Sequence, residues 1–216
     1  RARRCTPVSG TFTATKDYDG LTSVTVSGAG TSLSGVVNGD VVTLAGLSGA
    51  FANRHVGMGK SFTVSGATLA GAGSANYVLD PASSVTGTGD ITQQASVTWV
   101  GAASGNWSTA ANWALSSDLT KTGALPDGNN VALAIIPSTF TATVTADTAN
   151  AYTGKVQVNG GTLAVGTENY LGTAPGAAVA DAITLNGGTL LATNDITLNA
   201  NRGITLTGST TFNTAT

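Results

Sequence analysis

The stretches "VQVNGGTLAV" (residues 156–165) and "AITLNGGTLLA" (residues 182–192) repeat one pattern, and this pattern decides the fold of the C-terminal part of the chain. In each stretch, aliphatic residues alternate with polar ones before a shared "NGGTL", which begins at Asn159 and again at Asn186. Alternation at period two predicts strands. One such unit cannot bury its apolar face alone, so successive units must stack. We therefore predict a right-handed parallel β-solenoid (β-helix) over residues 131–216.

The turns of these units also make a prediction. Asn-Gly-Gly supplies the positive-φ corners that a solenoid needs between strands. Asparagines at equivalent positions of successive units, Asn159, Asn186 and Asn199, are expected to stack as a ladder. The pattern is still running where the sequence stops, so we expect a piece of a longer array.

The composition of the whole chain indicates an all-β protein. Only 9% of the 216 residues are charged, 29 are glycine, and Glu168 is the single glutamate. Glu, Lys, Arg and Gln, which usually cover the wet face of a helix, are therefore scarce. The net charge of −2 gives no basic face for nucleic acid. No apolar stretch is long enough to insert into a membrane.

The first ten residues, 1–10, form an Arg-rich tail with Arg1, Arg3 and Arg4. Two interpretations stay open: a non-native remnant or fragment boundary, and a basic arm that contacts nucleic acid or anionic lipid. Cys5 in this tail is the single cysteine, so no internal disulfide and no cysteine-based metal site is expected.

The remaining chain divides by texture into two further segments. Residues 11–94 show short alternating runs bounded by Gly, Asn or Asp, which predicts a compact β domain, sandwich-like or β-grasp-like. Residues 95–130 contain all three tryptophans, Trp99, Trp107 and Trp113. We expect this segment to cap the first solenoid unit and join it to the preceding domain, because an uncapped unit would expose its core.

Within the first domain, "KDYDG" (residues 16–20) resembles the motif that names the YDG domain, with Tyr18, Asp19 and Gly20. The resemblance extends over residues 16–91. It is also carried by "GD" at Gly39-Asp40, "VGxxK" at Val56–Lys60 and "NYxL" at Asn76–Leu79. The later "TWVGAASGNWSTAANW" and "LNGGTL" segments resemble the start and the rungs of β-helical passenger regions.

These resemblances imply a secreted, extracellular role at the bacterial cell surface, in haemagglutinin-like or autotransporter-like proteins. The expected function is non-catalytic: a stalk or display module of an adhesin that contacts host or neighbouring cells, including their glycans, or associates with itself. Two alternatives stay open, a carbohydrate-binding module and a filament-forming extracellular subunit. A passenger region whose enzyme lies elsewhere in a longer chain is a third hypothesis.

Two residues of the motif, Asp17 and Asp19, are candidates for chemistry. If Asp17 and Asp19 lie on one strand, their carboxylates share a face, and Asp-x-Asp-Gly echoes part of a calcium loop that here lacks its closing Glu. We weigh this calcium site against a glycosidase pair, which needs one buried acid, and against an architectural role. The architectural role is favoured: Tyr18 packs, Asp19 accepts local N–H bonds, and Gly20 takes a conformation barred to other residues.

The tryptophans and the few remaining reactive residues have similar alternatives. Trp107 and Trp113 could stack on sugars, but we favour a buried plug. Lys16 and Lys60 suggest an isopeptide crosslink for which no partner can be named. His55, the only histidine, is expected to be a hydrogen-bonded loop residue rather than part of a catalytic or zinc site.

Overall fold

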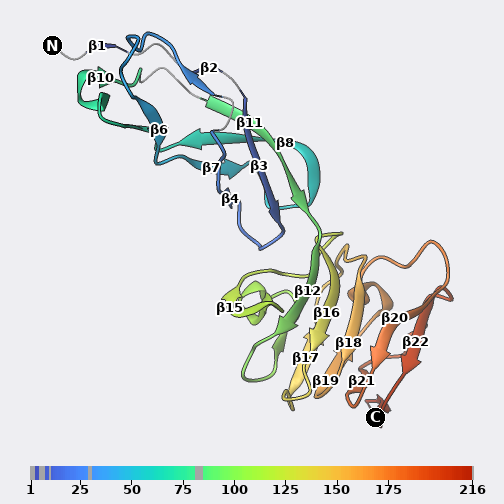
Figure 1. The fold of residues 1–216 in the computed structure, drawn as a ribbon. Coiled ribbons are helices and arrows are strands. Elements are labelled where there is room, and N and C mark those ends of the chain that lie inside the picture. The colour runs from blue at the N-terminus through green and yellow to red at the C-terminus, as the bar shows by residue number, and fades with distance from the viewer. Residues whose placement is uncertain (1–2, 5–7, 10, 29–30, 81–84, 216) are drawn as a thin grey trace. The chain divides into compact units, whose positions relative to one another are not determined.

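A computed structural model describes residues 3–4, 8–9, 11–28, 31–80 and 85–215. The chain is all-β, as predicted, with short strands and three single-turn 3₁₀ helices. It divides into two compact units (Figure 1). Unit 1 comprises Arg1–Asp17 and Thr22–Thr92, and unit 2 comprises Tyr18–Leu21 and Gln93–Thr216. Arg1 and Cys5 of the predicted tail lie outside the described residues.

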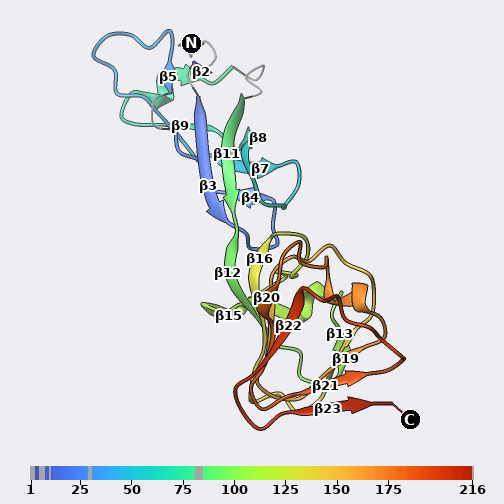
Figure 2. The same cartoon turned by 90° about the vertical axis from the view of Figure 1, so that its right-hand side faces the viewer.

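Unit 1 is built on a five-stranded sheet of order β3-β11-β8-β7-β4. Its strands are β3 (Phe12–Asp17), β4 (Ser23–Val24), β7 (Ser48–Phe51), β8 (Gly57–Ser65) and β11 (Val85–Thr92). β3 and β11 run side by side and parallel, with Asp17 opposite Thr92 (Figures 1 and 2). Just after β4, the Ser27 N–H donates to the Thr13 carbonyl of β3, so the two edges of the sheet approach each other.

Three two-stranded sheets complete unit 1. They pair β1 (Arg3–Arg4) with β10 (Tyr77–Val78), β2 (Val8–Ser9) with β5 (Ser32–Leu33), and β6 (Thr43–Ala45) with β9 (Thr68–Ala70); η1 (Ser74–Asn76) precedes β10. The β6–β9 pair continues the β7–β8 ladder as one ribbon. The ribbon bends where Gly46 and Gly66 face each other, both with positive φ. A Cβ on either glycine would lie within 3 Å of the other's carbonyl oxygen, so only glycine fits this corner.

The core of unit 1 contains aromatic side chains that pack against glycine residues. Phe12 and Phe62 are buried, and Phe62 packs edge-to-face on Phe51 with ring centroids 5.5 Å apart. A Cβ on Gly87 of β11 would lie 2.3 Å from the Phe62 ring, so glycine leaves the space that the ring fills. The glycines of β11 thus belong to the packing of the core.

Unit 2 contains two sheets, to which the chain contributes strands alternately from β16 onward. The first has the order β15-β14-β12-β16-β18-β20-β22 and the second β13-β17-β19-β21-β23 (Figure 2). The strands, in chain order, are β12 (Gln94–Trp99), β13 (Gly105–Asn106), β14 (Trp113–Leu115), β15 (Asp118–Thr122), β16 (Val131–Ile136), β17 (Thr143–Ala146), β18 (Lys155–Val158), β19 (Thr162–Val165), β20 (Val179–Leu185), β21 (Thr189–Ala192), β22 (Arg202–Leu206) and β23 (Thr211–Thr214). Short 3₁₀ turns are η2 (Ala110–Asn112) and η3 (Glu168–Leu171).

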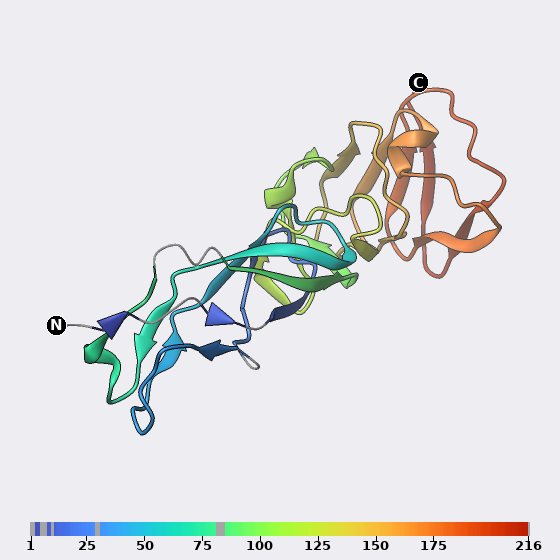
Figure 3. The ribbon, with the colours of Figure 1, turned by 90° about the horizontal axis from the view of Figure 1, so that it is seen from above.

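The strands β12, β16, β18, β20 and β22 of the first sheet pair in parallel, each with the next. The strands β13, β17, β19, β21 and β23 of the second sheet do the same. Figure 3 shows the later, orange and red strands following one another along unit 2. The first parallel strand of each sheet therefore lies within the tryptophan-rich segment. We expected the repeated strands to begin only at residue 131. The antiparallel hairpin β14–β15 is added at the edge of the first sheet.

The registers place like side chains in columns. One inward column of the first sheet contains Val97, Ala134, Val156, Ile183 and Ile204. In the second sheet, Val144, Leu163, Leu190 and Phe212 form another. Most of these side chains are buried, which is the aliphatic interior that the alternating pattern predicts. No helix among the described residues is long and apolar enough to cross a membrane.

The predicted asparagine ladder is confirmed for its first two members. The Asn186 Nδ2 donates to Asn159 Oδ1 at 3.3 Å, and the Gln157 amide donates to the same oxygen at 2.8 Å. The next position in register is Thr207, whose N–H donates to the Leu185 carbonyl. Asn199 was the wrong third member, because its side chain instead accepts from the Asn201 N–H in a local turn.

Candidate functional site

The YDG tripeptide lies in unit 2, although the chain on both sides of it belongs to unit 1. Tyr18 is fully buried, and its hydroxyl donates to the Leu125 carbonyl at 3.0 Å. The two residues are 107 positions apart in the sequence. Tyr18 therefore fixes a short N-terminal segment against the tryptophan-rich part of unit 2.

Gly20 makes the closest approach of this segment to its neighbours. Its φ is +81°, and an added Cβ would lie 2.2 Å from the Gly123 oxygen and 3.1 Å from the Ala124 nitrogen. Asp19 supports the same turn, since its Oδ1 accepts from the Leu21 N–H at 2.9 Å. These contacts agree with the architectural role that the sequence favoured for all three residues.

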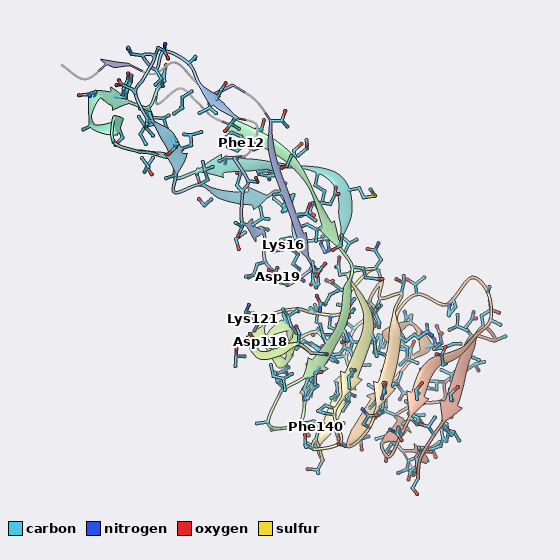
Figure 4. All side chains as sticks on the ribbon, in the orientation of Figure 1. Phe12, Lys16, Asp19, Asp118, Lys121 and Phe140 are labelled. Atoms are coloured by element: carbon cyan, nitrogen blue, oxygen red, sulfur yellow. The ribbon has the colours of Figure 1, made fainter. Side chains whose placement is uncertain are left out.

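An aromatic cluster lies beside this contact. Trp113 packs edge-to-face on Trp107 and on Trp99, with centroid separations of 4.6 and 5.2 Å. Phe140 extends the cluster at one end, and Tyr152 extends it at the other (Figure 4 labels Phe140). Each tryptophan is at least nine-tenths buried. The aromatic rings thus fill the interior beside the first parallel strands, β12 and β13.

Gly105 shows how the plug fits. In the second sheet Gly105 stands in register with Val144 of the next strand, where the inner column otherwise carries larger side chains. A Cβ on Gly105 would lie 3.3 Å from the Trp99 ring. The missing side chain thus gives Trp99 its space.

Two adjacent carbonyls join the YDG contact to the plug. Leu125 accepts from Tyr18, and Pro126 accepts from the Trp107 indole N–H at 3.2 Å. The Trp113 indole in turn donates to the Trp107 carbonyl at 2.9 Å. The two features that the sequence singled out separately therefore meet on one stretch of chain, 123–126.

Burial decides the sugar-stacking alternative for these rings. Trp107 is 6% exposed and Trp113 is not exposed at all. A sugar stacks on an open ring face, whereas Trp107 and Trp113 are buried and contact other aromatic rings. The carbohydrate site predicted at Trp107 and Trp113 would thus need rings that this structure does not expose.

Asp17 and Asp19, the two candidate calcium ligands, do not lie on one strand. β3 ends at Asp17, while Asp19 lies in the turn that follows it and in the other unit. Asp17 accepts from the Thr92 hydroxyl, and Asp19 from Leu21. Calcium takes six to eight oxygen ligands; among the described residues, no three His, Cys, Asp or Glu side chains group closely enough to hold a metal.

Residues of the other motifs of the first domain also form hydrogen bonds within unit 1. The Tyr77 hydroxyl donates to Asp40 at 2.6 Å and accepts from the Val37 N–H, so the "GD" and "NYxL" motifs meet. The Lys60 ammonium donates to Asn53 at 2.6 Å and to the His55 carbonyl at 2.5 Å. Burial lowers the pKa of Lys60. His55 itself is an exposed loop residue.

An ion pair in unit 2 escaped the sequence analysis. Arg202 is 5% exposed, and its Nε donates to Glu168, the only glutamate of the chain, at 2.8 Å. The same guanidinium donates to the carbonyls of Leu171 and Gly172. The Arg202 side chain of β22 thus fixes the η3 turn, which precedes β20 in the chain. The lone glutamate was the available signal, but its partner lies 34 residues away.

Two further interactions involve Lys155, the first residue of β18. The Tyr152 hydroxyl donates to the Lys155 carbonyl at 2.8 Å, and burial raises the pKa of Tyr152 well above its ordinary value. Lys155 also pairs with Asp181 of β20 at 2.6 Å, and this hydrogen bond lowers the pKa of Asp181. Both side chains of that pair are half exposed, so it contributes little to stability.

Comparison with known proteins supports one part of the sequence interpretation. No curated protein and no solved structure matches the chain significantly. The profile of the YDG domain family does match, from residue 2, in the Arg-rich head, to residue 87. Residues 2–87 therefore contain a YDG domain.

Proposed function

We propose that the chain is a non-catalytic segment of a large bacterial surface adhesin, in which a YDG domain is joined to the first coils of a parallel β-solenoid. The observation that carries the proposal is that, from β16 to β23, the chain adds strands alternately to two sheets and each pairs in parallel with the strand before it in that sheet. Each coil supplies one strand to each sheet, which is the construction of a solenoid. The YDG match supports the family part.

The role proposed for this assembly is mechanical. Successive coils are joined by hydrogen bonds in both sheets, by stacked aliphatic columns and by the Asn159–Asn186 contact. A chain built from repeating contacts between neighbours can extend without a growing core. We propose that the chain lies outside the cell. There it would hold binding surfaces away from the cell and present them to host or neighbouring cells.

Single-molecule stretching of the full chain tests the stalk role. Equivalent positions of two coils lie 27 residues apart, as Asn159 and Asn186 do. Loss of one coil should lengthen the chain by about 90 Å, at roughly 3.5 Å per residue. We expect stepwise extensions of this size. Smooth extension without steps would refute the proposed stalk.

Adhesion is tested separately, with beads that carry the full chain. We expect these beads to adhere to cultured epithelial or bacterial layers under flow more than beads that carry albumin do. Equal adherence of the two would remove adhesion from the proposal and leave the display role.

A further inference from the structure

We propose that the Asn38-Gly39 step of unit 1 is a site of spontaneous covalent modification, at which the asparagine converts to aspartate and isoaspartate. The chain contains three Asn-Gly steps, which begin at Asn38, Asn159 and Asn186. Glycine favours the reaction because it has no side chain to obstruct its own nitrogen. The fold distinguishes the first step from the other two. This proposal is independent of the stalk role.

The reaction requires only water and the two residues of the step. The main-chain nitrogen of the glycine, after losing its proton to solvent, attacks the side-chain Cγ of the asparagine. Ammonia leaves with a proton from solvent, and a cyclic succinimide forms. Water then opens the ring at either carbonyl, which gives aspartate or isoaspartate. In sum an amide is hydrolysed and no electron is transferred, so the decisive condition is that the nitrogen can reach Cγ.

The structure leaves Asn38 and Gly39 open to this reaction. Both residues are exposed. A Cβ placed on Gly39 would meet no heavy atom beyond its chain neighbours within 4 Å, so nothing confines the turn there. Among the residues that the structure describes, none forms a hydrogen bond with the Asn38 side chain or with the Gly39 N–H. No contact therefore has to break before the nitrogen approaches the amide.

The other two steps are held by contacts in unit 2. The Asn159 Oδ1 accepts from the Gln157 amide at 2.8 Å and from the Asn186 Nδ2 at 3.3 Å, so the amides of both steps are engaged. Gly160 is buried, and an added Cβ would lie 2.8 Å from the Phe140 carbonyl oxygen. Because such contacts must break first, they should slow the reaction at least about tenfold.

The modification would fall on a turn that two motifs of the YDG domain share. The Asp40 N–H donates to the Val37 carbonyl at 3.0 Å and closes the turn around Asn38 and Gly39. The Tyr77 hydroxyl donates to Asp40 at 2.6 Å and accepts from the Val37 N–H at 3.0 Å. Isoaspartate lengthens the main chain between these contacts by a methylene group and adds a carboxylate close to Asp40 in the sequence. We therefore expect it to loosen the turn from Tyr77.

Incubation of the full chain at mildly alkaline pH, followed by peptide mapping, tests the site. Mass-spectrometric fragmentation that distinguishes aspartate from isoaspartate locates the product. We expect the reaction at Asn38 to be at least about tenfold faster than at Asn159 or Asn186. In concentrated urea the three rates should converge, because the protection given by the fold is lost. Similar rates in the native protein would overturn the proposal, and so would a preference for Asn38 that persists in urea.

Asn38→Gln is the matched control, because it keeps an exposed amide whose longer side chain forms the corresponding ring much more slowly. Hydrogen exchange then measures the effect on the turn. After incubation, the Val37 and Asp40 amides of the natural chain should exchange about tenfold faster than before, whereas those of Asn38→Gln should not change. Unchanged exchange in the modified chain, or the same change in both proteins, would overturn the inferred loosening from Tyr77.

Discussion

Replacement of Gly20 by alanine tests whether the YDG turn is a structural contact of unit 2. The added methyl group would lie 2.2 Å from the Gly123 oxygen and 2.6 Å from the Gly123 carbonyl carbon. Both atoms belong to the backbone, so no side-chain rotation relieves the overlap. In addition, φ at Gly20 is +81°, a conformation that costs an L-residue about 1 kcal/mol.

The expected loss follows from these two contributions. Overpacking of a fixed contact costs about 2 kcal/mol, so Gly20→Ala should destabilise unit 2 by about 3 kcal/mol in total. Gly128→Ala is the matched control in the same unit: φ is +51°, and its nearest neighbour is the Asn130 amide nitrogen, 3.9 Å away. The control should lose only the conformational part, about 1 kcal/mol.

Urea denaturation followed by tryptophan fluorescence measures the difference, because all three tryptophans lie in unit 2. At a typical slope of about 2 kcal/mol per molar, the midpoint of Gly20→Ala should fall by about 1.5 M. That of Gly128→Ala should fall by about 0.5 M. Equal shifts for the two variants would refute the reasoning, as would a change confined to the far-ultraviolet dichroism while the fluorescence midpoint stays constant.

Three other predictions concern contacts within unit 2. Arg202→Ala should cost about 3 kcal/mol in urea denaturation, because it leaves two carbonyls and Glu168 without their donor; Glu168→Gln, which keeps an acceptor, should cost clearly less, and equal costs would contradict the role of the buried guanidinium. Because the folded protein keeps Tyr152 neutral, its contribution to stability is complete below about pH 10 and is lost as the pH rises further. The melting temperature of the natural chain should thus fall more between pH 9 and pH 11 (approximate limits) than that of Tyr152→Phe, and parallel curves would contradict this. Asn186→Ala removes the donor to Asn159 and should lower stability by about 0.5 kcal/mol, whereas a loss above about 2 kcal/mol would show that the exposed ladder does more than one hydrogen bond can.

Local pattern was sufficient to predict much of unit 2. Alternation in "VQVNGGTLAV" predicts that Val156, Val158 and Leu163 point inward, and all three are buried. The spacing of the repeated turn predicts the contact between Asn159 and Asn186. Such features can be predicted from the sequence because each depends only on a neighbouring strand.

Long-range partners could not be predicted in the same way. Nothing near Tyr18 indicates that its hydroxyl bonds to a carbonyl 107 residues later. The parallel pairing of β13 was not predicted for a related reason, because Gly105 has no side chain that would mark a strand and lies beside Trp99 of another strand. A shared strand face for Asp17 and Asp19 was not found, because β3 ends at Asp17 and the YDG turn follows it.

The position of Tyr18–Leu21 has a consequence for the order of folding. Residues 22–92 form a loop whose two ends both belong to unit 2, and closure of an unstructured loop of that length costs about 4 kcal/mol of chain entropy. Folding of unit 1 removes most of this cost in advance, because Asp17 and Thr92, the residues at which the chain leaves it, are partners on parallel strands. The YDG domain would then act as an intramolecular template: once it has folded, Tyr18 and β12 are delivered together, and unit 2 can nucleate on them.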